Sequence, residues 1–157
     1  MNNTTKTKLS EFTVEEARGW VIDSFNQIDW RLNKLIVDFF KPSEKEKFES
    51  IVLNTSIIDI GGKLKIIRSI GLLKPQIIDK IRNLASVRNG FAHSHTSISI
   101  KIELAKDTSK SNVASSERMI EVMNSNGELK SKKVLDYLIE FNDLFNEIIK
   151  ELNKYIE

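Results

Sequence analysis

Cysteine is absent from this 157-residue chain, and proline and histidine occur only twice each. Without thiols the chain can form neither disulfides nor thiolate metal sites. The first ten residues are polar, so the sequence predicts no signal peptide, no membrane-spanning segment and a cytoplasmic location. A hydrophobic content of 40% with 29% charged residues is typical of one soluble globular domain. We expect residues 1–12 to form a flexible N-terminus and residues 13–157 a single helical domain.

An excess of charge of one sign is also missing, since 24 basic and 22 acidic residues give a net charge of only +2. This balance does not require a nucleic-acid partner, but the charge is unevenly distributed along the chain. From Lys63 to Arg88 there are seven cations and a single carboxylate, that of Asp79. The local positive charge favours a polyanionic ligand, with Lys80 and Arg82 as candidate residues for binding RNA phosphate. Lysines on the solvent faces of helices would give the same pattern.

Helix-start and helix-stop signals divide the first part of the chain. Thr13 and Glu16 form a capping box, in which the side chain of each residue accepts a hydrogen bond from the backbone N–H of the other. Apolar residues then recur at helical spacing until Pro42, which ends the first predicted helix. Ser43 repeats the capping-box pattern and opens a shorter predicted helix through Leu53.

Two further helices are predicted before residue 90. Ser56 is the expected cap of a helix to Ile70, although Gly61-Gly62 inside it is unusual, because each interior glycine costs about 1 kcal/mol relative to alanine. Close approach of another helix would explain the two glycines. Pro75 fits the first turn of the next helix, which we expect to end at about Asn89. The predicted buried stripe of that helix comprises Ile77, Ile78, Ile81, Leu84, Ala85 and Val87.

The hydrophobic period changes after Ser94. Ser97–Leu104 alternates polar and apolar residues, as a half-buried strand does, and Arg118–Met123 is a second candidate strand. The polar segment Ala105–Ser116 between them is a predicted loop, and Asn126-Gly127 is a predicted turn. This pattern indicates a β-hairpin attached to the helices.

The C-terminal segment returns to helical spacing. Ser131 is the expected cap of a last helix that runs to about Tyr155, and its apolar residues, alternately four and three apart, form a heptad seam. That seam could serve the core alone or the core and a partner chain. The predicted fold is therefore mainly α, an antiparallel bundle of four to five helices with a small β-hairpin insertion near residues 97–123.

The segment Arg88-Asn89-Gly90-Phe91-Ala92-His93 has the most informative chemistry. The guanidinium of arginine is a permanent cation whose planar fork of donors matches phosphate oxygens, and histidine can transfer protons near neutral pH. Five residues of unbroken helix turn through about 500°, so Arg88 and His93 would point about 140° apart. Their convergence within one chain needs the helix to end or distort at Gly90. Otherwise each must meet a partner on a second copy of the chain.

This hexapeptide in a helical setting resembles the Arg-x4-6-His motif of HEPN domains. Arg88 matches the motif arginine, His93 the motif histidine, and Asn89 the polar residue that commonly follows the arginine. The full string is similar to the mannitol-repressor-like branch of that superfamily, and the resemblance covers about residues 13–94 and the C-terminal helix. It implies a dimeric helical protein. Many members are metal-independent ribonucleases, as toxins or phage-defence effectors, while others have lost catalysis and act as binding modules.

The resemblance implies a reaction in which the RNA 2′-OH attacks the adjacent phosphate. His93 would take or deliver a proton, Arg88 would stabilise the charge of the phosphorane, and Asn89 would orient the phosphate or His93. His95 is a candidate auxiliary residue. We expect no cofactor and no metal, because the carboxylate nearest to the two histidines in the sequence is that of Glu103. The expected partners are RNA, a second copy, and an antitoxin or regulatory protein.

Non-catalytic interpretations of the motif stay open. His93 could be a structural histidine, Arg88 a cation favoured by the helix dipole, and Asn89-Gly90 a plain helix cap. The chain would then be a HEPN-like regulator, similar to mannitol-repressor-like proteins, that binds nucleic acid, a nucleotide or a protein without turnover. The two interpretations differ in whether Arg88 and His93 face solvent in a cleft or are sequestered.

We predict a homodimer in solution, with the two motifs facing a common groove. One motif supplies only one histidine, whereas cleavage needs an acid and a base, and a two-fold axis brings the same residues of two chains together. Light scattering at tens of micromolar protein should therefore give twice the mass of one chain. A monomer, or a dimer whose motifs lie on opposite surfaces, would contradict this prediction.

Overall fold

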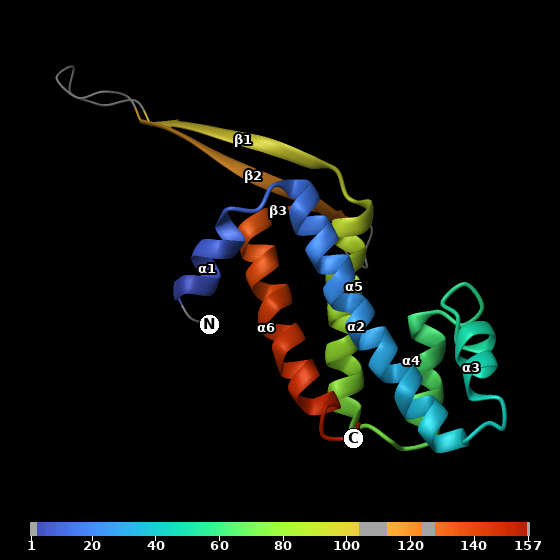
Figure 1. The fold of residues 1–157 in the computed structure, drawn as a ribbon. Helices are drawn as coiled ribbons and strands as arrows, with labels where there is room; N and C mark the ends of the chain where they lie inside the picture. Colours follow the sequence, from blue (N-terminus) through green and yellow to red (C-terminus); the bar gives the residue numbers. More distant parts are fainter. Residues whose placement is uncertain (1–2, 104–112, 124–127, 157) are drawn as a thin grey trace.

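The computed structural model describes residues 3–103, 113–123 and 128–156. Within these ranges the chain forms six α-helices and one three-stranded antiparallel sheet, so the predicted mainly α fold with a small β insertion is confirmed (Figure 1). In the part of the chain that is described, no helix is both long and apolar enough to cross a membrane.

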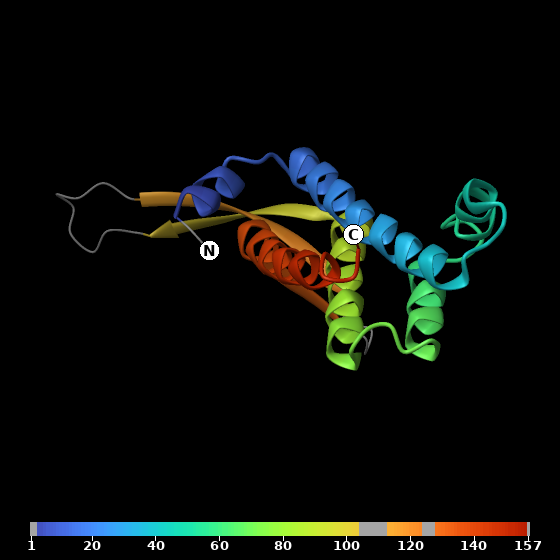
Figure 2. The same cartoon turned by 60° about the horizontal axis from the view of Figure 1, so that its bottom comes forward.

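Three long helices form the centre of the bundle. α2 and α5 are antiparallel, and α6 packs against both of them. α4 packs on α2 and α5, while α1 lies against α6 (Figures 1 and 2). A short helix, α3, continues into a π-helical turn, Phe48–Val52. The helices span Asn3–Ser10 (α1), Val14–Phe40 (α2), Lys45–Lys47 (α3), Ile60–Ser69 (α4), Pro75–His93 (α5) and Val134–Leu152 (α6).

The predicted boundaries of α2 are confirmed. Glu16 N donates to Thr13 Oγ1 at 3.1 Å and Thr13 N donates to Glu16 Oε2 at 2.7 Å, which completes the capping box. The hydrogen bond from the Thr13 backbone lowers the pKa of the Glu16 carboxyl. Before Pro42, Lys41 adopts a left-handed conformation with φ 45°, and this residue ends the helix.

The predicted cap at Ser56 is wrong. Ser56 is bound instead by Asn54, whose Oδ1 accepts from Ser56 N at 3.0 Å and from Ser56 Oγ at 2.6 Å. This local turn delays the helix, and Asp59 caps α4 by accepting from Gly62 N at 2.8 Å. Gly61-Gly62 therefore lies in the first turn of the helix, where the nearest side chains are those of Ile58 and Asp59 rather than those of another helix.

Two other predicted caps are also wrong. Glu44, not Ser43, occupies the N-cap position of α3, and its side chain makes no capping hydrogen bond. Ser131 lies in a strand, paired with Glu121, so α6 begins only at Val134 and ends at Leu152. Serine is a good cap only where the backbone is free to start a helix, and at Ser131 strand pairing takes precedence. The heptad seam of α6 faces the core, with Val134, Leu138, Phe141, Ile148 and Leu152 buried.

The predicted hairpin is confirmed as β1 (Thr96–Glu103) paired antiparallel with β2 (Val113–Met123). Figures 1 and 2 show this hairpin projecting past the helices on the side of α1. A third strand, β3 (Leu129–Lys133), pairs with β2 and was not predicted. The predicted end of the loop is wrong, because Val113–Ser116 pairs with β1 and belongs to β2, which begins before the predicted start at Arg118. Residues 105–112 of the predicted loop and the predicted turn at Asn126-Gly127 lie outside the described residues.

The N-terminal segment contains a helix where the sequence predicts a flexible end. α1 covers Asn3–Ser10, and the side chain of Leu9 is buried in the main hydrophobic core. A single leucine among polar residues gives no helical period, so the sequence contained no signal for this element.

One ion pair of the bundle is buried. Lys63 Nζ of α4 donates to both carboxylate oxygens of Asp29 on α2, at 2.7 and 2.8 Å. The Lys63 side chain is 0% exposed and that of Asp29 is 20% exposed. Thr55 Oγ1 lies 3.2 Å from Asp29 Oδ2, so the carboxylate also receives a hydroxyl hydrogen bond. The pair joins α4 to α2 and removes Lys63 from the cations that could meet a ligand.

Asp29→Ala should therefore destabilise the fold strongly. The substitution leaves a fully buried ammonium without its anion, which costs about 3–5 kcal/mol in such pairs. Urea unfolding followed by circular dichroism should show a lower midpoint at an unchanged slope. The matched control is Asp38→Ala, also on α2, which breaks the exposed pair with Lys45 of α3 and should cost at most about 1 kcal/mol. Equal losses in the two variants would contradict the assigned role of the buried pair.

Candidate active site

Helix α5 does not end at Asn89, as predicted, but continues through Gly90 to His93. Ser94 N closes the last turn by donating to Gly90 O at 3.0 Å. Gly71 is the only glycine with positive φ among the described residues, so Gly90 is neither a left-handed cap nor a distortion. A Cβ at Gly90 would lie 2.9 Å from Tyr137 Oη of α6. Glycine is needed here because α6 approaches α5 closely.

The unbroken helix places Arg88 and His93 on different faces, about 140° apart. Arg88 faces α2, with its Cζ 5.5 Å from the centre of the Phe25 ring. Its Nε is buried and has no hydrogen-bond partner. His93 is exposed on the other side of the helix. Within one chain the structure therefore does not bring the two motif residues together.

Three of the predicted site residues meet in a cavity of about 530 Å³ beside the end of α5. Asn89, His93 and His95 all line it. The volume lies in the range of small-molecule sites in proteins. The other lining residues are Ser86, Gly90, Ser94, Glu121 and Leu129. This cavity is our candidate active site.

Asn89 links Arg88 to the cavity. Arg88 Nη1 donates to Asn89 Oδ1 at 2.8 Å. A guanidinium has no acceptor, so the amide atom that it contacts must be the carbonyl oxygen. The NH₂ group of Asn89 is left to donate elsewhere, and Asn89 lines the cavity. Arg88 thus fixes the orientation of a donor in the cavity without lining it.

Glu121 is a site residue that sequence reasoning missed. It comes from β2, and its backbone N donates to His95 O at 3.1 Å, which ties the segment after α5 to the sheet. The signal that could have found it is the hairpin itself, because antiparallel pairing places the end of the second strand beside the start of the first. Arg18 of α2 was also missed. It donates from Nη2 to Ser94 O at 2.7 Å and so holds the end of α5.

The predicted phosphate-binding residues lie away from this cavity. Lys80 is about 20 Å from His93 along the axis of α5, at 1.5 Å per residue, and it pairs with Glu147 of α6. Arg82 lies 3.5 Å from Asp79, which Arg68 also approaches to 3.4 Å. Much of the local positive charge between Lys63 and Arg88 is therefore already balanced within the chain.

The contact between α5 and α6 beside the cavity is aromatic. Tyr137 stacks on Phe91 with ring centres 5.2 Å apart, and Lys132 Nζ lies 4.6 Å from the centre of the Tyr137 ring. Burial, with a smaller contribution from Glu140, raises the pKa of Tyr137 to about 12. Its hydroxyl therefore stays protonated at neutral pH. The hydroxyl packs against the backbone of α5 at Gly90.

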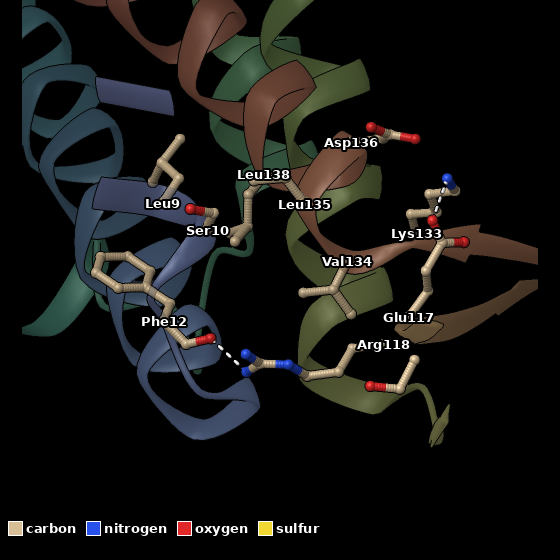
Figure 3. Close-up of a pocket in the computed structure, with 11 residues that line it drawn as sticks. Leu9, Ser10, Phe12, Glu117, Arg118, Lys133, Val134, Leu135, Asp136 and Leu138 are labelled. Atoms are coloured by element: carbon tan, nitrogen blue, oxygen red, sulfur yellow. Dashed lines mark hydrogen bonds and ion pairs between the residues drawn. The ribbon is translucent and has the colours of Figure 1, made fainter. Parts of the chain in front are cut away.

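A second cavity, of about 290 Å³, lies between α1, β2 and the start of α6 (Figure 3). The charged groups of Glu117, Arg118 and Lys133 have hydrogen-bond partners within the chain. Arg118 donates to the carbonyl of Phe12, and Lys133 Nζ lies 2.6 Å from Glu117 Oε1 (Figure 3). This hydrogen bond raises the pKa of Lys133. None of the predicted site residues lines this cavity, which we regard as structural.

Gly90→Ala should destabilise the protein, although alanine is the better helix former. The added methyl must displace Tyr137, which is buried and stacked on Phe91, at a cost of about 1–3 kcal/mol. The control is Gly19→Ala in α2, where a Cβ meets nothing within 4 Å and helix propensity should add up to about 1 kcal/mol of stability. Denaturant unfolding of both variants measures the difference. A Gly90→Ala protein as stable as Gly19→Ala would contradict the close approach of the helices.

The candidate site thus combines two imidazoles, an amide donor and a carboxylate. Within the described residues, no three His, Cys, Asp or Glu side chains gather closely enough to hold a metal ion. Imidazole groups can exchange protons near neutral pH, and an amide NH₂ can donate to a phosphate oxygen. This arrangement suits acid–base chemistry on a phosphate ester. Comparison with protein-family models, with curated proteins and with solved structures finds no match to this chain.

Proposed function

We propose that this protein is a metal-independent endoribonuclease of the HEPN type. The observation that supports this most directly is that His93 and His95 line one cavity together with Asn89. Cleavage by the RNA 2′-OH needs one group to accept a proton and another to donate one. His93 and His95 supply two imidazoles within one chain. The composite dimer site that the resemblance to HEPN proteins implies would add the same residues of a second copy across a common groove.

In the proposed reaction the 2′-OH attacks the adjacent phosphorus and the bond to the 5′-oxygen breaks. One of His93 and His95 takes the proton from the 2′-OH, and the other delivers a proton to the leaving 5′-oxygen. The NH₂ group of Asn89 donates to a non-bridging oxygen and stabilises the charge that develops there. The products are a 2′,3′-cyclic phosphate and a free 5′-hydroxyl.

Arg88 acts in this proposal through Asn89. Its Nη1 holds the amide oxygen at 2.8 Å, while the guanidinium packs against Phe25. A direct contact with phosphate would require Arg88 to leave Phe25. The biological setting that fits such an enzyme is that of a toxin or phage-defence effector, restrained by an antitoxin or regulatory protein.

The partial burial of Arg88 favours a second candidate function. An arginine whose Nε is buried against an aromatic ring is in part a packing residue. In this alternative the protein is a non-catalytic, mannitol-repressor-like regulator of HEPN type that uses the same cavity to bind nucleic acid or a nucleotide.

We predict that the purified protein cleaves labelled single-stranded RNA in EDTA and leaves a 2′,3′-cyclic phosphate. His93→Ala and His95→Ala should each lower the rate by about 10²–10⁴-fold, the usual value for general acid–base catalysis. Arg88→Ala should cost about 10²–10³-fold, as loss of an oriented oxyanion donor does, and adding Asn89→Ala should then cost little more. End mapping and initial rates measure these effects.

The control variant is Thr96→Ala, an exposed change beside His95 that leaves the cavity lining intact. RNA with a 2′-deoxy sugar at the cut site should survive, because its nucleophile is missing. Expression in a growing host should be toxic for the wild type and harmless for His93→Ala. If the wild type is as inert toward RNA as His93→Ala, the ribonuclease proposal fails and the regulator takes its place.

A further inference from the structure

The carboxylate of Glu121 is free in the candidate active site. Glu121 lines the cavity with His93 and His95, and its backbone is fixed by the hydrogen bond to His95 O at 3.1 Å. Among the described residues, no hydrogen bond or ion pair involves its side chain, and neither imidazole lies at ion-pair distance from it. A partly buried carboxylate without a partner is a strong acceptor available to a ligand.

Phosphate cannot be the group that Glu121 receives, because two anions repel each other. The donors of the cavity, Asn89 and the two histidines, suit the phosphate, whereas Glu121 suits a neutral group that carries N–H donors. In an RNA ligand those donors are on the nucleobase. Single-stranded RNA is read in this way, through the Watson–Crick edge of an unstacked base.

Leu129 supplies an apolar surface beside this carboxylate. β2 and β3 pair with Glu121 opposite Ser131 and Met123 opposite Leu129. Glu121 and Leu129 are therefore diagonal neighbours on one face of the sheet, within reach of a common ligand. Leu129 is 65% exposed and lines the same cavity. A flat base can pack on its side chain while its edge meets Glu121.

We infer that this cavity contains a guanine subsite, with Glu121 as the residue that determines base specificity. Guanine presents two adjacent donors, N1–H and N2–H, which a carboxylate can accept as a bidentate pair. Adenine and cytosine place a ring acceptor beside their single amino group, and uracil places its N3–H between two carbonyls. Each of these edges would place an acceptor lone pair against a carboxylate oxygen, and the two would repel each other. The inference rests on the proposed function, since it names the RNA base beside the cleaved phosphate.

Binding of 3′-mononucleotides, measured by calorimetry, tests the inference without requiring turnover. The wild type should bind 3′-GMP about 5- to 150-fold more tightly than 3′-AMP, 3′-CMP or 3′-UMP, the discrimination expected of one bidentate base contact. The inosine 3′-nucleotide, which lacks the N2 amino group, should bind with intermediate affinity. Glu121→Gln should remove the preference for guanine, because an amide offers one acceptor and one donor.

The matched control is Glu117→Gln, which removes a carboxylate from the same strand but from the other cavity. It should keep the preference for guanine. Equal binding of the four nucleotides by the wild type, or a preference that survives in Glu121→Gln, would overturn the inference. So would a wild type that binds no nucleotide.

Mapping of cuts in a mixed-sequence RNA separates the two proposals. Cleavage concentrated at guanosines in the wild type, and spread over all four nucleotides in Glu121→Gln, supports both the ribonuclease and the guanine subsite. Cleavage without base preference overturns the guanine subsite and leaves the ribonuclease standing. Selective binding of 3′-GMP that depends on Glu121, without any cleavage, supports the subsite and rejects the ribonuclease.

Discussion

The close approach of α5 and α6 at Gly90 and Tyr137 determines how the end of the bundle is arranged. Because Gly90 has no side chain, Tyr137 can lie against the backbone of α5 and stack on Phe91. α5 stays helical through this contact, and its 100° turn per residue then sends Arg88 toward α2 and His93 toward the cavity. Without that contact a glycine in this position would be free to end the helix and bring the two side chains together.

The same geometry places the two charged or titratable residues of the motif, Arg88 and His93, on different sides of α5. Arg88 lies between Phe25 and Asn89, where it combines packing with orientation of an amide. His93 shares the cavity with His95 and Glu121, which reach it because β2 pairs back toward the end of α5. The β insertion is thus part of the candidate site, since it contributes the carboxylate and the apolar surface of Leu129.

Much of the fold could be predicted from the sequence, because its signals are local. The capping box at Thr13, the prolines and the period-2 segment after Ser94 each act within a few residues. The errors arose where a nearby group competes for the same backbone. Ser56 donates its hydrogen bonds to Asn54, and Ser131 pairs with Glu121 in the sheet. Leu129–Lys133 was missed as a strand because one leucine among lysines and serine shows no period.

For the candidate site, Asn89, His93 and His95 could be identified from the motif, and the structure gathers them in one cavity. Glu121 was not identified, because its place beside His95 depends on the exact register of the hairpin, and the periodicity predicted the two strands without predicting how they pair. The count of cations before Arg88 overestimated the positive charge available to a ligand, for a related reason. Their acidic partners, Asp29 and Glu147, lie on other helices and are invisible to a count along one segment.

The burial of Lys63 has a further consequence for experiments on this protein. Its amine is closed to solvent, whereas the amines of lysines such as Lys45, Lys47 and Lys154 are exposed. A reagent that modifies lysines can reach Lys63 only when α4 moves away from Asp29 on α2. The rate of that modification therefore reports the free energy of a local opening at the end of the bundle remote from the cavity. Comparing that rate with the unfolding of the whole protein would show whether α4 opens from α2 independently of the rest of the bundle.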